Sequence, residues 1–114
     1  MRLADSDTVD YLSVEKDGRT VVATLVDDFE GSDLLQRLAL LQRKVNRYFE
    51  VIESGEVFEQ LERATGRRVA RSTPVRIEIV AKQGLEGEGE RFFEHVASAA
   101  RGAAVELSFR VLEP

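Results

Sequence analysis

The stretch that decides the fold runs from Asp33 to Gly55 and reads DLLQRLALLQRKVNRYFEVIESG. Apolar side chains recur in it at alternating spacings of four and three residues, the period of one helix face. They are Leu34, Leu38, Leu41, Val45, Tyr48 and Ile52. Asp33, with Gln36 three residues later, is typical of a helix N-cap, and Gly55 is typical of the residue that ends a helix. The stretch predicts an amphipathic helix over residues 33–53 that packs on a sheet.

The same helix carries more apolar surface than packing on one sheet requires. At about 100° per residue, Leu40 and Val51 lie on a second side, next to the outer edge of Tyr48. Stable proteins cover such a strip with a second helix or a second subunit. We therefore expect a homodimer whose interface includes Leu40, Tyr48 and Val51.

Strand patterns lie on both sides of this helix. The apolar runs 9–15 and 20–26 flank Asp17-Gly18, which predicts a hairpin closed by a two-residue turn with positive φ at both positions. The run 20–26 is apolar on both faces, as in an interior strand. Further along, the pattern predicts a short helix over 56–64, a strand over 75–79 after Pro74, a helix over 90–101 and a strand over 105–111.

This order of elements predicts an α+β fold, a two-layer α/β sandwich of order β-β-α-β-α-β. Both long helices need the same sheet to cover their apolar faces, so we expect a four-stranded mixed sheet with both helices on one face. A chain of 114 residues and 12.8 kDa suits one hydrophobic core. We expect a single globular domain over residues 9–114, preceded by a flexible N-terminus of residues 1–8.

A set of residues in and around the long helix resembles a small bacterial family of unknown function. The residues that carry the resemblance are Val9-Asp10, Leu41-Gln42, Lys44, Asn46, Tyr48 and Ile52-Glu53-Ser54-Gly55-Glu56. The order of elements matches from about Val9 to Leu112. The resemblance implies a stand-alone cytosolic domain and brings no catalytic residues with it. The segment Arg71-Ser72-Thr73-Pro74 departs from the family pattern.

Composition excludes several classes of function. The chain has no cysteine, which removes disulfides, thiolate catalysis and cysteine zinc sites. No apolar run approaches the roughly 20 residues of a membrane helix, and the N-terminus has no apolar core of a secretory signal. We therefore expect a cytoplasmic protein that does not contact membranes and needs neither a cofactor nor a metal.

The net charge of −5 is unevenly distributed. Residues 1–33 carry nine acidic and three basic side chains, whereas residues 34–84 carry ten basic and six acidic ones. Residues 85–114 return to six acidic and three basic. Such a layout suits self-association in which the basic middle of one subunit approaches the acidic first third of another.

Polar side chains at the edge of the long helix form the first candidate site. Gln42, Asn46 and Glu53 make a stripe beside Val45, close to Tyr48. Polar groups at a core margin usually satisfy a backbone group, because an unpaired buried one costs about 1–3 kcal/mol. Asn46 would then hold the segment after Gly55. The alternative is a ligand site made of Gln42, Asn46, Tyr48 and Glu53.

Two loops and one histidine resemble known functional sites but lack residues that those sites require. Twelve residues counted from Asp27 or Asp28 end on Leu38 or Ala39, so the glutamate that completes a calcium loop is missing. The glycines of residues 84–90 lack phosphate-loop spacing, and the glutamates between them would repel phosphate. His95 is the only histidine and has no nucleophile assigned to it.

An arginine cluster forms the last candidate. Four arginines lie within nine residues: Arg63, Arg67, Arg68 and Arg71. Guanidinium groups suit both phosphate backbones and carboxylates. The acidic chain and the lack of interleaved aromatic residues argue against nucleic acid. The cluster is therefore a possible patch for an anion or an acidic partner, in the same chain or in another.

These observations favour a non-enzymatic protein-interaction domain, of the adaptor or immunity-protein type, that self-associates and binds another protein. The alternative is a small-ligand-binding protein or an enzyme with a site near Asn46, Tyr48 and Glu53.

Overall fold

Seven helices and strands make up the fold. The structure is a computed structural model and describes residues 3–5 and 7–112. The elements are β1 (Tyr11–Val14), β2 (Val21–Asp27), α1 (Leu34–Glu53), α2 (Glu56–Thr65), β3 (Val75–Ala81), α3 (Glu88–Gly102) and β4 (Val105–Val111). The predicted order is confirmed, with α2 as the short helix expected after α1.

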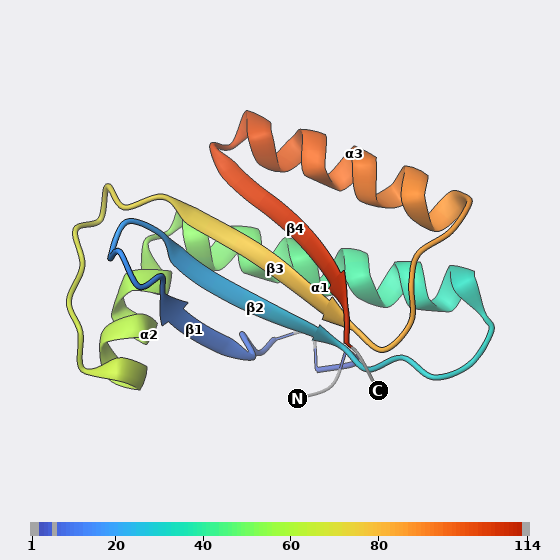
Figure 1. The fold of residues 1–114 in the computed structure, drawn as a ribbon, viewed down its shortest axis with the longest axis horizontal. Coiled ribbons are helices and arrows are strands. Elements are labelled where there is room, and N and C mark those ends of the chain that lie inside the picture. Colours follow the sequence, from blue (N-terminus) through green and yellow to red (C-terminus); the bar gives the residue numbers. More distant parts are fainter. Residues whose placement is uncertain (1–2, 6, 113–114) are drawn as a thin grey trace.

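The four strands form one mixed sheet in the order β1-β2-β3-β4 (Figure 1). β1 pairs with β2 in antiparallel orientation, and β2, β3 and β4 run parallel to one another. The predicted interior position of β2 is therefore confirmed. In the described chain β4 has a neighbouring strand on one side only.

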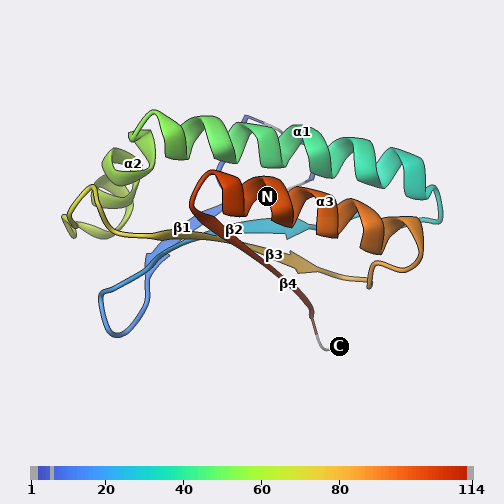
Figure 2. The same cartoon turned by 90° about the horizontal axis from the view of Figure 1, so that it is seen from above.

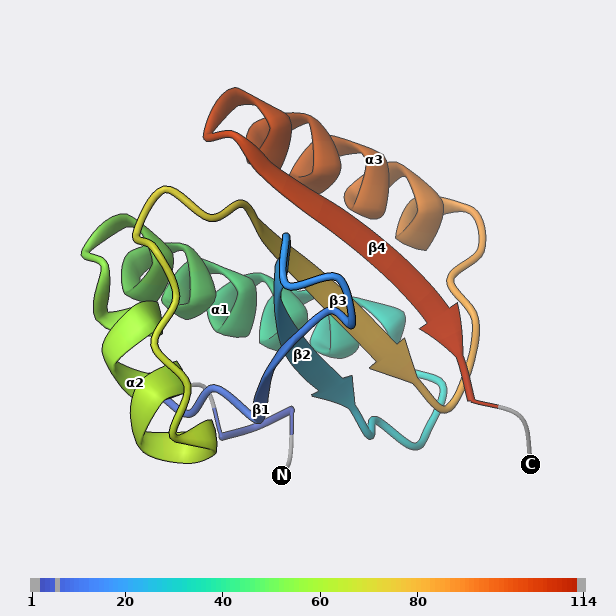
Figure 3. The same ribbon diagram turned by 60° about the vertical axis from the view of Figure 1, so that its left-hand side comes forward.

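The long helices α1 and α3 lie on the same face of this sheet (Figure 2). Ala23, Ile77 and Leu107 share one row of the register and point toward this helical layer. In Figures 1 and 3, α1 lies behind the sheet, whereas α3 projects sideways past β4. The predicted two-layer α+β arrangement is thus confirmed, with α3 at its margin.

The ends of α1 follow the predicted capping residues. The Asp33 side chain accepts a hydrogen bond of 3.1 Å from the backbone N–H of Gln36. Gly55 follows the helix with a φ of 81°, which glycine adopts without steric cost. Because Gly55 also starts α2, the chain turns sharply there and α2 packs beside α1.

The predicted interface strip on α1 is wrong in two of its three residues. Val51 and Tyr48 are each only 1% exposed, and Val51 belongs to the same buried cluster as Val57 and Leu61 of α2. Leu40 is half-buried and packs against that core. Tyr48 and Val51, which were expected to face a second subunit, are therefore buried within the chain's own core. The homodimer itself stays a prediction.

The hairpin is confirmed, but its two-residue turn is wrong. Gly18 has a φ of 71°, whereas Ala104 is the only non-glycine residue in the described chain with positive φ. The N–H of Gly18 bonds to Glu15 O at 2.8 Å, and the N–H of Glu15 bonds to Thr20 O at 2.9 Å. The loop is therefore four residues long, as in hairpins built on a type I turn.

Core packing begins before the predicted domain boundary at Val9. Leu3 is 1% exposed and belongs to the core cluster, and its N–H donates to Asp28 Oδ1 at 2.9 Å. At the other end of the chain, α3 buries Val96 and Ala100 as predicted, but Ala99 is exposed.

Candidate functional site

The four residues of the predicted ligand site do not converge. Gln42 donates to Asn46 at 2.8 Å on the outer side of α1, an ordinary pair one helical turn apart. Asn46 and Glu53 are exposed, whereas Tyr48 is buried on another side of the helix. The expectation that Asn46 holds the segment after Gly55 is therefore wrong.

Tyr48 instead ties α1 to two segments of the N-terminal third. Its hydroxyl donates to Thr24 O at 2.6 Å and accepts from the Asp10 N–H at 2.8 Å. Burial is the main cause that raises the pKa of Tyr48; the hydrogen bond with the Asp10 backbone lowers it, and the Asp10 carboxylate raises it further. The hydroxyl is thus a neutral structural bridge in the core.

Asp10 is also the partner of a buried lysine. Lys44 Nζ lies 2.8 Å from Asp10 Oδ1, and the N–H of Val26 donates to Asp10 Oδ2 at 2.7 Å. Lys44 occupies the core side of α1, between the apolar positions Leu41 and Tyr48. A lysine among core-facing positions was the sequence signal for this network. Three residues of the family resemblance, Asp10, Lys44 and Tyr48, meet here in a closed and paired cluster.

A second buried ion pair closes the carboxyl ends of the parallel strands, where α/β proteins often bind ligands. Arg37 Nε donates to Asp27 Oδ2 at 2.8 Å. Its remaining nitrogens donate to Gly84 O at 2.8 Å and Gln83 O at 2.7 Å. The Arg37 side chain therefore fills this place and anchors the loop that leads into α3.

These pairs explain the uneven charge distribution. Four ion pairs join acidic residues of the first third to basic residues of the middle. They are Asp10–Lys44, Glu15–Arg76, Asp27–Arg37 and Glu30–Lys82. The hydrogen bonds that Arg76 and Lys82 donate to Glu15 and Glu30 raise the pKa of both basic side chains. The charges that suggested contact between subunits thus meet within one chain.

The arginine cluster lies on the outer side of α2. Arg68 pairs with Glu62 and Arg71 with Glu59, both at 3.4 Å. Arg71 also donates to Gly55 O at 3.3 Å. All four arginines, Arg63, Arg67, Arg68 and Arg71, are exposed. Two of them therefore meet acids of α2, not the acidic N-terminal third.

The acidic loop after β2 and His95 form no functional site with the described residues. The acids of the loop after β2 serve structural roles: Asp27 and Glu30 form ion pairs, Asp28 binds the Leu3 backbone and Asp33 caps α1. His95 is exposed. Among the described residues, no three acidic or histidine side chains gather in a way that could hold a metal. No helix in the same residues is long and apolar enough to cross a membrane.

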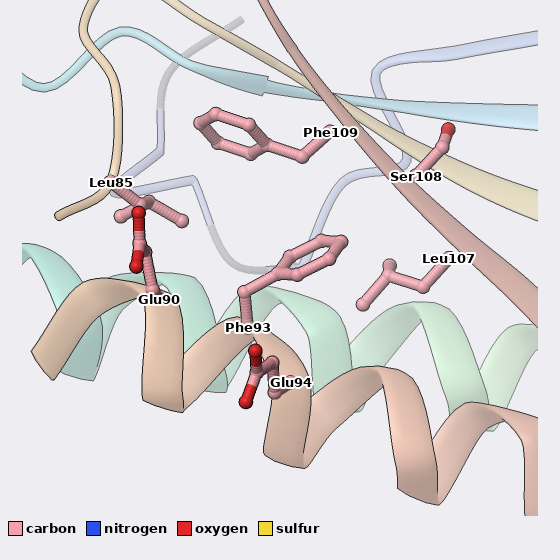
Figure 4. Close-up of a pocket in the computed structure, with 7 residues that line it drawn as sticks. All are labelled: Leu85, Glu90, Phe93, Glu94, Leu107, Ser108 and Phe109. Carbon is pink, nitrogen blue, oxygen red and sulfur yellow. The ribbon is translucent and has the colours of Figure 1, made fainter. Parts of the chain in front are cut away.

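A groove between α3 and β4 is a hollow that a partner could fill. Its volume is about 680 Å³, and Figure 4 shows its lining side chains. They are Leu85, Glu90, Phe93, Glu94, Leu107, Ser108 and Phe109. Phe93 and Phe109 meet edge to face across it, with ring centroids 5.9 Å apart. The floor of the groove is therefore apolar and partly aromatic.

The groove owes its shape to the loop before α3. Gly89 is buried, and a Cβ placed on it would lie 3.0 Å from Leu85 Cδ2 and 3.2 Å from Leu85 Cβ. Glycine at this position lets Leu85 pack against the first turn of α3. Leu85 thereby becomes part of the groove lining.

Acidic side chains and a strand edge border this groove. Glu90 and Glu94 are exposed and make no ion pair with a described residue, and no basic side chain lines the groove. Ser108 belongs to β4, an edge strand that has no neighbouring strand on one side among the described residues. In Figure 4, Leu107 points toward α3 and Ser108 points away from it. The strand and the helix were predictable from the sequence, but the space between them was not.

Comparison with known proteins identifies a family and nothing further. A family of unknown function (DUF6572) matches residues 1–113. No curated protein matches the chain. No solved structure matches it either.

Proposed function

The chain belongs to this family of unknown function, and we propose that it works as a protein-interaction domain whose partner occupies the groove between α3 and β4. The observation that carries the proposal is an apolar groove of about 680 Å³ beside the free edge of a seven-residue strand. Two kinds of binding surface therefore lie next to each other.

The free edge offers directional binding. An unpaired strand presents a row of N–H and C=O groups to a new strand, and proteins usually shorten, charge or cover such edges. β1, at the opposite edge, is only four residues long and lies beside α2. β4 is longer, contains no proline and ends at Val111, which is 43% exposed, and the next residue, Leu112, is 44% exposed.

The proposed interaction does not require the chain to self-associate. Two of the three residues expected to pair two subunits, Tyr48 and Val51, are buried within the chain and support no interface. Because α3 projects past β4, a second complete domain laid edge to edge on β4 would meet that helix (Figure 3). These two observations favour a partner other than an identical domain, with a segment slim enough to enter the groove.

A non-enzymatic role is part of the same proposal. The buried ionisable side chains Asp10, Asp27, Arg37 and Lys44 pair with one another and lie away from the groove. The alternative site near Asn46, Tyr48 and Glu53 has weaker support. Asn46 borders a hollow of about 320 Å³, but neither Tyr48 nor Glu53 lines it.

The proposal is tested by photo-crosslinking in cells that carry the gene naturally. A photoreactive amino acid replaces Ser108, beside the groove, or Ser13, its control. Both serines belong to the sheet face opposite the helices, but Ser13 lies on β1, at the other edge. We expect a discrete protein adduct from position 108 and none from position 13. Equal labelling from both positions, or none from position 108, would refute the groove as an interaction surface.

A further inference from the structure

We infer that the occupant of the groove is an extended peptide segment in which every second residue is lysine or arginine, added to β4 as a fifth strand. This inference rests on the proposed function and names the chemistry of the partner. Three features carry it: the free edge of β4, the position of α3 and the charge of the groove.

The position of α3 selects an extended segment. The helix lies beside β4 on the helical face and projects past the strand, so a strand added at this edge would lie over it (Figures 1 and 3). The ordinary spacing of strands is about 4.8 Å, and a sheet packs about 10 Å from its covering layer. An added strand would bond to β4 and cover Phe93 and Phe109, which the chain itself leaves half-buried. A helix in the same place would leave the β4 backbone unpaired.

The lining side chains select basic residues at the positions that face α3. In an added strand, alternate side chains point toward α3, onto the apolar surface of Phe93, Leu107 and Phe109. Glu90 and Glu94 form the acidic rim of this surface, with no basic residue among the lining side chains. A lysine or arginine can lay its methylene stem on the aromatic rings while its charged end reaches a carboxylate. A neutral or acidic strand would leave the two glutamates without partners.

A second copy of the chain is the weaker candidate, although β4 has some self-complementarity. Antiparallel pairing about Ser108 would place Glu106 opposite Arg110 of the other copy. Arg110 already pairs with Glu78 at 2.8 Å, however, and the projecting α3 stands in the way of the other copy's helical layer. The groove suits a peptide that brings no bulky domain of its own to the edge of β4.

The test uses the full chain and a capped seven-residue peptide of alternating valine and lysine. Binding is followed by amide chemical shifts and by hydrogen exchange of β4. We expect saturable shifts in α3 and β4, slower exchange at the outer N–H groups of β4, and weaker binding at high salt. A valine–glutamate peptide should not bind. Of two peptides N-methylated on alternate residues, only the one that blocks the N–H groups facing β4 should lose binding.

Matched variants test the charge argument. Glu90→Gln/Glu94→Gln should weaken binding by about tenfold, because two exposed ion pairs are lost. Glu86→Gln/Glu88→Gln removes two exposed glutamates that do not line the groove and should leave binding unchanged. Equal effects of the two double variants would show a diffuse charge effect and overturn the assigned site.

The failure of this inference differs from that of the proposed function. If the valine–lysine peptide does not bind but position 108 still crosslinks a protein, the basic strand is wrong and the interaction surface stands. If that crosslinked protein is the chain itself, a second copy replaces the peptide as occupant. If neither experiment gives a signal, both proposals are wrong.

Discussion

The ammonium group of Lys44 lies 2.8 Å from a carboxylate oxygen of Asp10, and both side chains are fully buried. Burying two charges costs several kcal/mol of hydration free energy, which attraction and added hydrogen bonds must offset. Asp10 gains such bonds from the N–H of Val26, and its own N–H donates to Tyr48. One ion pair thus joins the segment before β1, strand β2 and helix α1.

Replacing the buried lysine should destabilise the fold strongly. Lys44→Met leaves the Asp10 carboxylate buried without its cation, for which we expect a loss of about 3–5 kcal/mol. Chemical denaturation measures it. Lys16→Met, at an exposed position in the hairpin loop, should change stability by less than about 0.5 kcal/mol. A small effect for both variants would mean that Asp10 is not held as a buried anion.

Replacing Arg37 with lysine should destabilise the fold. One ammonium group cannot reach Asp27 and the carbonyls of both Gln83 and Gly84 in the geometry of the guanidinium group. We expect Arg37→Lys to cost about 1–3 kcal/mol and to speed hydrogen exchange in the loop before α3. Arg43→Lys, an exposed change on the same helix, should do neither. Unaltered exchange in that loop would contradict the anchoring role.

Tyr48 should limit stability at high pH. Its pKa is raised above the ordinary value of 10.0 by burial, so the folded state keeps the phenolic proton that the unfolded state loses. The stabilisation is fully present below about pH 10 and is lost as the pH rises further, by up to about 1.4 kcal/mol per pH unit. Tyr48→Phe should flatten this decline in denaturation curves. Tyr11→Phe, at a position 51% exposed, should retain it.

Any side chain placed at Gly18 should destabilise the fold, because the backbone there is left-handed. A Cβ at Gly18 meets no atom within 4 Å, so only the φ of +71° opposes it. We expect Gly18→Ala to cost about 1–2 kcal/mol. Gly102 is equally open but has no such φ, and Gly102→Ala should be neutral or slightly stabilising. Equal melting temperatures for the two variants would count against the hairpin geometry.

The periodic segments could be predicted because their cause is local. The alternation of β3, the spacing of α1 and the capping by Asp33 and Gly55 depend on residues within one or two turns of each other. The hairpin was predicted for the same reason. Its turn type was not, because Asp17 keeps a negative φ while its carboxylate accepts the N–H of Arg19 at 2.9 Å.

The candidate sites were less predictable, because they depend on which segments meet. The sequence by itself determined a four-stranded mixed sheet with helices on one face, since hydrophobic periods dictate which side of each element must be buried. Only the tertiary structure decided that Val51 is buried in one core with residues of α2, that Lys44 pairs with Asp10 across 34 residues, and that α3 lies beside β4 with a groove between them. Contacts between distant segments follow from packing and from the pairing of buried charges, neither of which a period along one chain records.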